Sequence, residues 1–312
     1  MKLIKVMLVV VFGYLLTACG DSNSDSKTYS RVDFSVSDAP VDGFSEVRID
    51  IEQVEFIHDN GDRTFHEVDR SVNLLEYPGT SSALILSDIE LQTGDYKNLI
   101  IHVKPGSGLN YVMKIATPGV EENLKQPSNK LKLGSFTVTD EGVQAFTIEF
   151  DLRQALVLRG NSGSNNGYIL KPHGVTIIGN PTAASLQGTV DSFLFDAGSC
   201  LEASGNYVYL YAGSGLDVTK LVDNFDVNDV DFDNELPALG SIAPYASAAV
   251  DFISGFYAFG YLPAGDYTVA FSCGAVGDDP VQFDDLTIPD PSGQFEHITL
   301  LDSQVLVHDF QP

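Results

Sequence analysis

The chain alternates apolar and polar residues soon after residue 30, a pattern typical of β-strands with one buried face. Residues 32–36 and 47–51 each carry apolar side chains at every second position. The apolar positions then shift by one, to Val54 and Phe56. Because this change moves the buried face, we expect a β-bulge near Glu52-Gln53.

Asn60-Gly61 lies between two extended runs and predicts a tight hairpin, because both central residues of such a turn need positive φ. Two segments, 81–90 and 151–159, fit either a strand or a short helix. No long amphipathic helix is visible, so this part of the chain is predicted to be mainly antiparallel β. Its further strands are expected near residues 96–103, 110–116, 144–151 and 174–178.

A cluster of turn residues, Gly179-Asn180-Pro181-Thr182, marks the expected boundary between two domains. The pattern Leu-x-x-Gly-Asp-Tyr occurs at residues 91–96 and 262–267, and we interpret it as a recurring hairpin. The short strands predicted after the boundary are typical of a β-sandwich. The predicted fold class is therefore all-β, with two antiparallel β-sandwich-like domains at residues 31–180 and 183–312. The strands expected in the second domain are 185–195, 206–212, 247–253, 256–261, 266–273, 283–288, 294–301 and 304–309.

The N-terminus has the parts of an export signal: two lysines, Lys2 and Lys5, then an apolar run at 6–16. The run is shorter than the roughly 20 residues that span a bilayer as a helix. It ends in Leu16-Thr17-Ala18-Cys19, which resembles the processing box of bacterial lipoproteins. That resemblance implies removal of a signal peptide, residues 1–18, and a diacylglycerol thioether on Cys19.

Residues 19–30 would then form a lipidated flexible tether, because they are polar and lack apolar periodicity. Gly20 follows the cysteine, where an aspartate often signals inner-membrane retention, so the outer membrane is favoured in a Gram-negative source. The expected location is the cell envelope, with the lipid anchor holding the protein to the membrane. An ordinary secretory signal, with Cys19 incidental, is the alternative.

With a formal net charge of −26, the chain has no electrostatic footprint for nucleic acid or for an anionic membrane surface. The charge is uneven, since Lys220 is the only base after residue 182. This asymmetry has two interpretations: solubility in a salty habitat, or a cation site.

Cys200 and Cys273 remain as a pair if Cys19 carries lipid. In a chain exported to an oxidising compartment, an even pair predicts a disulfide, and two buried free thiols are the alternative.

Six acids crowd into thirteen residues and are the candidate metal ligands: Asp223, Asp226, Asp229, Asp231, Asp233 and Glu235. Oxygen-rich clusters suit Ca²⁺, which takes roughly 6–8 oxygen ligands. The EF-hand pattern fails, because Asn234 and Gly240 stand where its glycine and glutamate belong. The hypothesis is weak Ca²⁺ binding that orders the loop, and the alternative is a strand with one solvated acidic face.

No catalytic constellation is visible. The six histidines are scattered, and no serine has the Gly-x-Ser-x-Gly spacing of a nucleophile elbow. Asp38 and Asp42 could pair for acid–base chemistry, but an Asx-type turn at Asp38 with a bend at Pro40 is the simpler interpretation.

A set of short motifs recurs in order along residues 31–179: Ser37-Asp38-Ala39-Pro40-Val41-Asp42, Val47-x-Ile49-x-Ile51-x-x-Val54, Leu131-Lys132-Leu133, Phe150-Asp151 and Tyr168-Ile169-Leu170-Lys171-Pro172. On these motifs, residues 31–179 resemble the bacterial domain-of-unknown-function family 4382. That resemblance implies an exported β-rich lipoprotein domain without an established activity.

The second part of the chain has two motifs of its own, Leu186-Gln187-Gly188-Thr189-Val190 and Leu262-Pro263-Ala264-Gly265-Asp266-Tyr267. On these, residues 183–312 resemble, more weakly, the carboxypeptidase regulatory-like, transthyretin-type sandwich domains. That resemblance implies a non-catalytic module.

The function predicted from these features is a lipid-anchored, non-catalytic binding or structural module that engages a glycan or an envelope protein. The alternative is an envelope hydrolase that uses carboxylates from the acidic loops, which would require two carboxylates roughly 5–10 Å apart.

Overall fold

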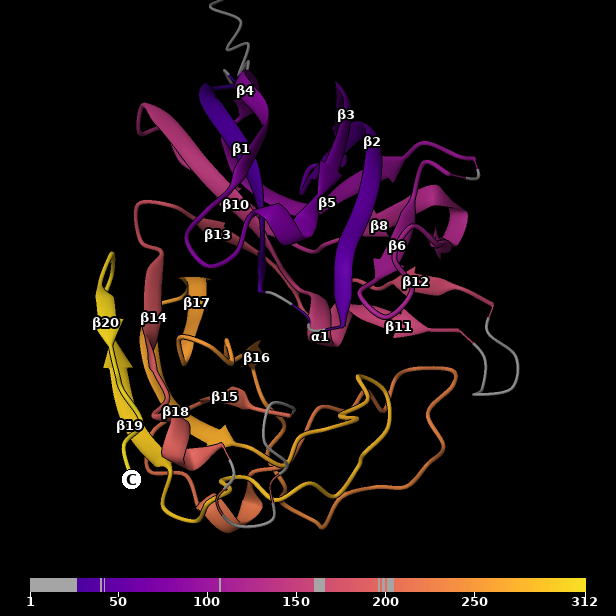
Figure 1. The fold of residues 1–312 in the computed structure, drawn as a ribbon. Coiled ribbons are helices and arrows are strands. Elements are labelled where there is room, and N and C mark those ends of the chain that lie inside the picture. Colours follow the sequence, from indigo (N-terminus) through magenta and orange to yellow (C-terminus); the bar gives the residue numbers. More distant parts are fainter. Residues whose placement is uncertain are drawn as a thin grey trace, which may run out of the picture.

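The computed structural model describes residues 27–39, 41, 43–106, 108–159, 166–195, 197, 200 and 205–312. The predicted signal peptide and Cys19 lie outside the described residues. Strands dominate the described residues and form four separate sheets, two before residue 180 and two after it (Figure 1). The all-β prediction is confirmed. We call residues 27–179 the first half and residues 184–312 the second half.

The first half contains a four-stranded sheet, in the order β13-β10-β1-β4, and a nine-stranded sheet. Its strands are β1 (Tyr29–Ala39), β2 (Phe44–His58), β3 (Arg63–Asn73), β4 (Ala83–Gln92), β5 (Gly94–Val103), β6 (Tyr111–Lys114), β7 (Glu121–Lys125), β8 (Lys130–Lys132), β9 (Phe136–Val138), β10 (Val143–Asp151), β11 (Leu156–Leu158), β12 (Tyr168–Leu170) and β13 (Val175–Gly179). Its helical turns are η1 (Leu74–Glu76), η2 (Pro127–Asn129) and α1 (Leu152–Ala155).

The core of the first half lies between these two sheets. Phe34 on β1 contacts both Phe56 on β2 and Phe146 on β10, with ring centroids 5.0 and 5.4 Å apart. The pairing of β2 with β3 and β5 shifts register between Ile51 and Gln53, which confirms the predicted bulge.

The second half also has two sheets, ordered β17-β14-β20 and β16-β15-β18-β19, around its own core. Its strands are β14 (Ala184–Thr189), β15 (Tyr207–Ala212), β16 (Ala246–Ala249), β17 (Phe256–Leu262), β18 (Gly265–Ser272), β19 (Phe295–Leu300) and β20 (Val305–Val307). Two short helical turns, η3 (Ser192–Leu194) and η4 (Val218–Lys220), lie in its loops. None of the helices in the described part of the chain has both the length and the apolar character to cross a membrane.

Several local expectations differ from the structure. Three of the four sheets are mixed, because β1 pairs in parallel with β10, β7 with β12, and β14 with β20. The sheet β16-β15-β18-β19 is antiparallel throughout, as expected. The hairpin at Asn60-Gly61 forms, but Gly61 has φ +94° while Asn60 stays outside the positive-φ region, so the loop is longer than a two-residue turn. Segment 81–90 belongs to strand β4, whereas segment 151–159 contains both α1 and β11.

The repeated Leu-x-x-Gly-Asp-Tyr pattern is a corner and not a hairpin. In each copy the glycine starts a strand that belongs to a different sheet from the strand before it, β4 to β5 and β17 to β18. The hydroxyl of Tyr96 donates to the Gln92 carbonyl, and that of Tyr267 to the Pro263 carbonyl, both at 2.9 Å. The tyrosine therefore fastens the chain where it crosses from one sheet to the other.

The predicted strand at 283–288 is wrong. The backbone N–H groups of Asp284 and Leu286 donate to the Asp223 carboxylate, and Asp285 has φ +54°. The Asp223 side chain thus accepts hydrogen bonds from backbone N–H groups that would otherwise pair with a neighbouring strand.

The two halves pack closely against each other at the level of α1 (Figure 1). The Tyr261 hydroxyl donates to the Thr80 carbonyl at 2.9 Å, and the Gln154 amide donates to the Tyr245 carbonyl at 3.2 Å. Gly260 lies so close to the backbone of the first half that an added Cβ would come within 1.9 Å of the Gly79 oxygen. Arg153 also pairs with Asp278 across this contact, at 2.5 Å.

Candidate functional site

A groove of about 750 Å³ lies on the first half, next to four neighbouring strands, β3, β2, β5 and β8. The strand register places Glu55 opposite Ile100, and Ile100 opposite Lys132. Because side chains alternate along a strand, these residues face away from the core that takes Val54, Phe56 and Leu131. The groove is lined by Glu55, Ile57, Arg63, Asn98, Ile100, Ser128, Lys130, Leu131, Lys132, Leu170, Lys171 and Pro172.

The groove carries positive charge in a strongly acidic chain. Four of its lining residues are basic, and Glu55 is the only acid among them. Glu55 is buried and accepts hydrogen bonds from Arg63 at 2.5 Å and from His102 at 2.9 Å. Burial acts to raise the pKa of Glu55, but the hydrogen bonds from His102 and Arg63 outweigh it and lower that pKa. The carboxylate is therefore ionised and already neutralised by its neighbours.

Lys130 and Lys132 are the bases available to a ligand. Both side chains are exposed, and neither has an ion-pair partner within the described ranges. Phe65 lies opposite Glu55 on β3 and is half exposed, so an aromatic ring stands beside the groove. The combination of two free ammonium groups, an amide at Asn98 and a nearby ring suits an anionic ligand with some apolar surface.

Lys171, at the far wall of the groove, joins the first half to the acidic loop of the second. Its ammonium forms an ion pair with the buried Asp229 carboxylate, and His173 Nδ1 lies 4.0 Å from Asp226 Oδ2. Burial lowers the pKa of Lys171, while the charges of Asp231, Asp226 and Asp279 oppose that change. Lys171 therefore neutralises part of the negative charge of the acidic loop.

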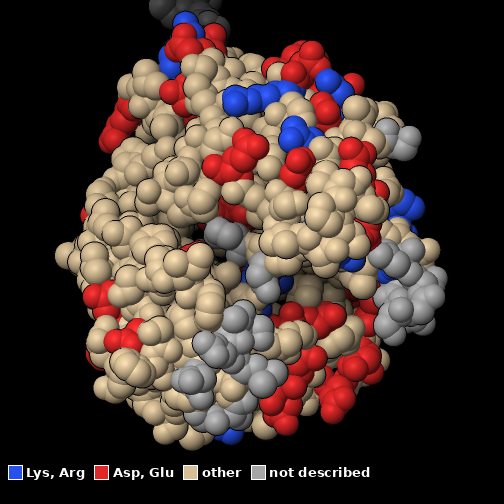
Figure 2. Space-filling view, viewed as in Figure 1, with Lys and Arg blue, Asp and Glu red and all other residues tan. Residues whose placement is uncertain are grey.

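The structure does not bring the six acids of residues 223–235 together. Asp226, Asp229 and Asp233 each accept the backbone N–H two residues ahead, and Val230 is 94% exposed, so the segment is a series of turns and not a strand. Burial raises the pKa of Asp223 to about 6, against the hydrogen bonds from Leu286 and Asp284. Calcium binding by this loop stays a prediction. Acidic side chains gather on the lower right of the second half in Figure 2.

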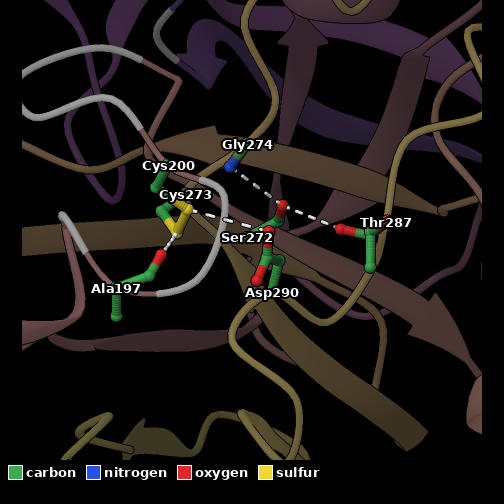
Figure 3. The surroundings of a disulfide bond; sticks show 7 residues. All are labelled: Ala197, Cys200, Ser272, Cys273, Gly274, Thr287 and Asp290. Atoms are coloured by element: carbon green, nitrogen blue, oxygen red, sulfur yellow. Dashed lines mark hydrogen bonds between the residues drawn. A yellow bond between two sulfur atoms is a disulfide. The ribbon is translucent and has the colours of Figure 1, made fainter.

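Cys200 and Cys273 form a disulfide with Cα atoms 5.3 Å apart, as predicted (Figure 3). Cys273 is fully buried at the end of β18, and its N–H donates to the Asp290 carbonyl at 3.0 Å. Across the described residues, the only three acidic, histidine or cysteine side chains with ligand atoms within 4.8 Å of one another are Cys200, Cys273 and Asp290. Because both sulfurs are in the bridge, this group is not a metal site.

Three buried carboxyls lie near the contact between the halves: Asp38, Glu149 and Asp151. Sequence reasoning considered Asp38 but missed Glu149 and Asp151 as candidate site residues. Asp38 lies next to the last residue of β1 and does not form the expected Asx turn. The Leu152 amide faces its carboxylate, but neither carboxylate oxygen receives a hydrogen bond of good geometry within the described residues. Asp42, its proposed partner, lies outside the described residues. Burial raises the pKa of Asp38 and of Glu149 well above the ordinary range, and that of Asp151 to about 7.

Residues 29–172 match the domain of unknown function DUF4382. This match agrees with the resemblance seen in the sequence of the first half. No curated protein matches the chain.

Solved structures resemble the chain only distantly. They include the Bacillus anthracis TIE protein, at 10% identity over 90% of this chain with a TM-score of 0.21. This chain spans 34% of the TIE protein. A candidate cell adhesion protein of Parabacteroides distasonis ATCC 8503 matches over 88% of this chain and 83% of its own, at 10% identity and a TM-score of 0.19. A fimbrial protein of Bacteroides ovatus ATCC 8483 matches over 91% and 49%, at 9% identity and a TM-score of 0.19.

Proposed function

We propose that this protein is a lipid-anchored binding module of the cell envelope that holds an acidic glycan in the groove of its first half. The observation that supports the proposal is the pair of unpartnered lysines, Lys130 and Lys132, in a chain of net charge −26. A chain so acidic repels polyanions over most of its surface, so a basic groove attracts them to one place. The predicted lipid on Cys19 would keep that groove close to the membrane.

A glycan fits this groove better than a peptide does. Sugar rings combine many hydroxyls with small apolar faces, and the groove offers Asn98 and Ser128 beside Ile57, with Phe65 at its side. Carboxylate or sulfate groups on the same glycan would then pair with Lys130 and Lys132.

The hydrolase alternative is not favoured by the geometry. Glu149 and Asp151 do flank a cavity, but it has a volume of only about 40 Å³. Sites for small molecules are usually about 300–1,000 Å³, so this cavity has no room for a sugar ring.

Isothermal titration with an oligogalacturonate and with a neutral oligosaccharide of equal length tests the proposal. The acidic oligosaccharide should bind more tightly, and its affinity should fall as salt is added. Lys130→Ala with Lys132→Ala should weaken binding roughly tenfold, equivalent to about 1.4 kcal/mol. The matched control is Lys97→Ala with Lys125→Ala, which removes the same charge from exposed sites outside the groove.

Equal affinity for the neutral oligosaccharide, or equal losses in both double variants, would refute the groove as an acidic-glycan site. Binding of an acidic peptide with no binding of any glycan would retain the groove and overturn the glycan assignment.

A further inference from the structure

A small cavity of about 40 Å³ lies at the contact between the two halves and has no place in the proposed function. Its walls come from β10 and β13 of the first half and from residues 245–246 and β17 of the second. Most of the lining is apolar or glycine. The polar exceptions are Glu149, Asp151, Thr176, Tyr245 and Tyr261, and the hydroxyl of Tyr261 donates to the Thr80 carbonyl.

The two carboxylates reach the cavity from one strand. Glu149 and Asp151 are two residues apart on β10, so both face away from the first-half core and toward the second half. Asp151 accepts the Arg153 N–H on one oxygen and the Ser247 N–H on the other, each at 3.0 Å. Oε2 of Glu149 has no hydrogen-bond partner among the described residues, although Glu149 is more than nine-tenths buried.

A third carboxylate adds to the negative field. Asp38 is fully buried on β1, the strand paired with β10, and neither of its oxygens has a well-formed hydrogen bond. It does not line the cavity, so it contributes charge and not a ligand. Buried charges of one sign are costly unless an opposite charge compensates them.

The neighbouring groups supply only part of that compensation. The charge of Arg153 acts to lower the pKa of Asp151, and a hydrogen bond from the Ser37 hydroxyl acts to lower that of Glu149, but burial outweighs both. The guanidinium of Arg153 pairs with Asp278 at 2.5 Å and lies 3.4 Å from the centre of the Tyr207 ring. Tyr245 hydrogen-bonds to Thr176, and β16 and β17 place no base in the cavity lining. Among the residues that the structure describes, no base therefore forms an ion pair with any of these three buried carboxyls.

We propose that this cavity is a calcium site that joins the two halves. Its donors would be the Glu149 and Asp151 carboxylates and the Thr176 and Tyr245 hydroxyls, an all-oxygen set that suits a hard cation. A cavity of about 40 Å³ has room for one ion together with a water or two, since one water needs roughly 10–15 Å³ of such space. Mg²⁺ fits less well, because it demands octahedral geometry and usually keeps several waters.

The bound ion would face β10 on one side and Tyr245 on the other. It would thus neutralise the carboxyls of the first half only while the second half is in place, so calcium would strengthen the contact between them. This site is separate from the acidic loop at residues 223–235.

The test uses the full mature chain, stripped with a chelator and dialysed. Calcium alone is titrated by calorimetry at constant ionic strength, with magnesium as comparison, and the bound metal is counted by mass spectrometry. We expect one calcium per chain and a higher melting temperature. Glu149→Gln should weaken calcium binding at least tenfold, while Asp231→Asn with Asp233→Asn in the acidic loop should leave it unchanged.

Terbium provides a second measurement that does not depend on the Glu149 variant folding. The chain has no tryptophan, so tyrosines must sensitise bound terbium. Because both Tyr245 and Tyr261 line the cavity, Tyr245→Phe should reduce that emission and Tyr245→Phe with Tyr261→Phe should remove most of it. Absence of stoichiometric calcium, or equal binding by wild type and Glu149→Gln, would overturn the proposal. Loss of binding in the loop variant instead would place the ion in the loop. If Glu149→Gln stabilises the calcium-free protein and calcium does nothing, protons neutralise the carboxyls and the proposal is wrong.

Discussion

Replacing Arg153 by methionine would measure how strongly the two halves are joined. Arg153 lies in α1, and its guanidinium pairs with Asp278 in the second half at 2.5 Å. The two side chains are 5% and 0% exposed, so solvent does not screen the pair. Methionine keeps the length and apolar stem of the side chain but removes the charge.

The structure sets the expected magnitude. Removing one partner of a buried ion pair costs about 3–5 kcal/mol, because the other charge is left without its counter-ion. Asp278 would still accept hydrogen bonds from the Tyr209 hydroxyl at 2.7 Å and from the Asn224 side chain at 2.8 Å. These donors place the expected loss at the lower end, about 3 kcal/mol, to which the lost stacking on Tyr207 adds about 1 kcal/mol.

Urea unfolding of wild type, Arg153→Met, Asp278→Asn and the double variant forms a double-mutant cycle that isolates the pair. We expect a coupling free energy of about 2 kcal/mol. The matched control is the cycle for Arg31 and Asp88, an exposed Arg–Asp pair at 2.9 Å, which should give less than about 1 kcal/mol. An interface coupling no larger than this control would refute the view that the pair holds the halves together.

Four other predictions follow from the chain and its contacts. Cys19→Ser should release the protein from membranes, and fractionation that leaves its distribution unchanged would contradict lipidation. Reduction of the Cys200–Cys273 bridge, which spans 73 residues, should lower the unfolding free energy of the second half by up to roughly 4–5 kcal/mol, measured by urea unfolding with and without reductant; an unchanged midpoint with both thiols free would refute this. Gly260→Ala should lower the free energy of unfolding by about 1–3 kcal/mol, because the added Cβ would meet the Gly79 oxygen. The control Gly265→Ala, whose added Cβ has its nearest contact at 3.6 Å, should lower it less. Equal losses in the two variants would count against the close contact. Limited proteolysis should cut near residues 179–183 and leave two stable fragments, and a single cut elsewhere would contradict two domains.

The strands that the sequence pattern predicted are those with one face in the core and one in water. Residues 32–36 alternate because β1 buries Phe34 and its neighbours on a single face, and the shift to Val54 marks a real bulge. Segment 283–288 has enough apolar residues for a strand, but its N–H groups go to Asp223, a residue about 60 positions earlier. A local pattern does not reveal such a distant partner.

The candidate sites were hidden for the same reason. Nothing in the sequence distinguishes Lys130 and Lys132 from other lysines. Only the pairing of β8 with β5 shows that both lie beside one groove. Glu149 and Asp151 alternate with Ile148 and Phe150, which looks like a strand with a solvated acidic face. The second half covers that face, and this contact between distant parts of the chain is invisible in the local pattern.

The parallel pairing of β20 with β14 sets an order on the folding of a newly made chain. Leu186 pairs with Leu306, so the edge of β14 stays without this partner until the ribosome has added some 120 further residues. A chain is made from its N-terminus, so the first half can complete both of its sheets while the second half is still unfinished. During that interval β14 presents open hydrogen-bonding groups that can pair with other chains. A chain that ends before Val305 would never gain the β20 partner of β14. Such a truncated protein should therefore aggregate, while the groove of its first half stays intact.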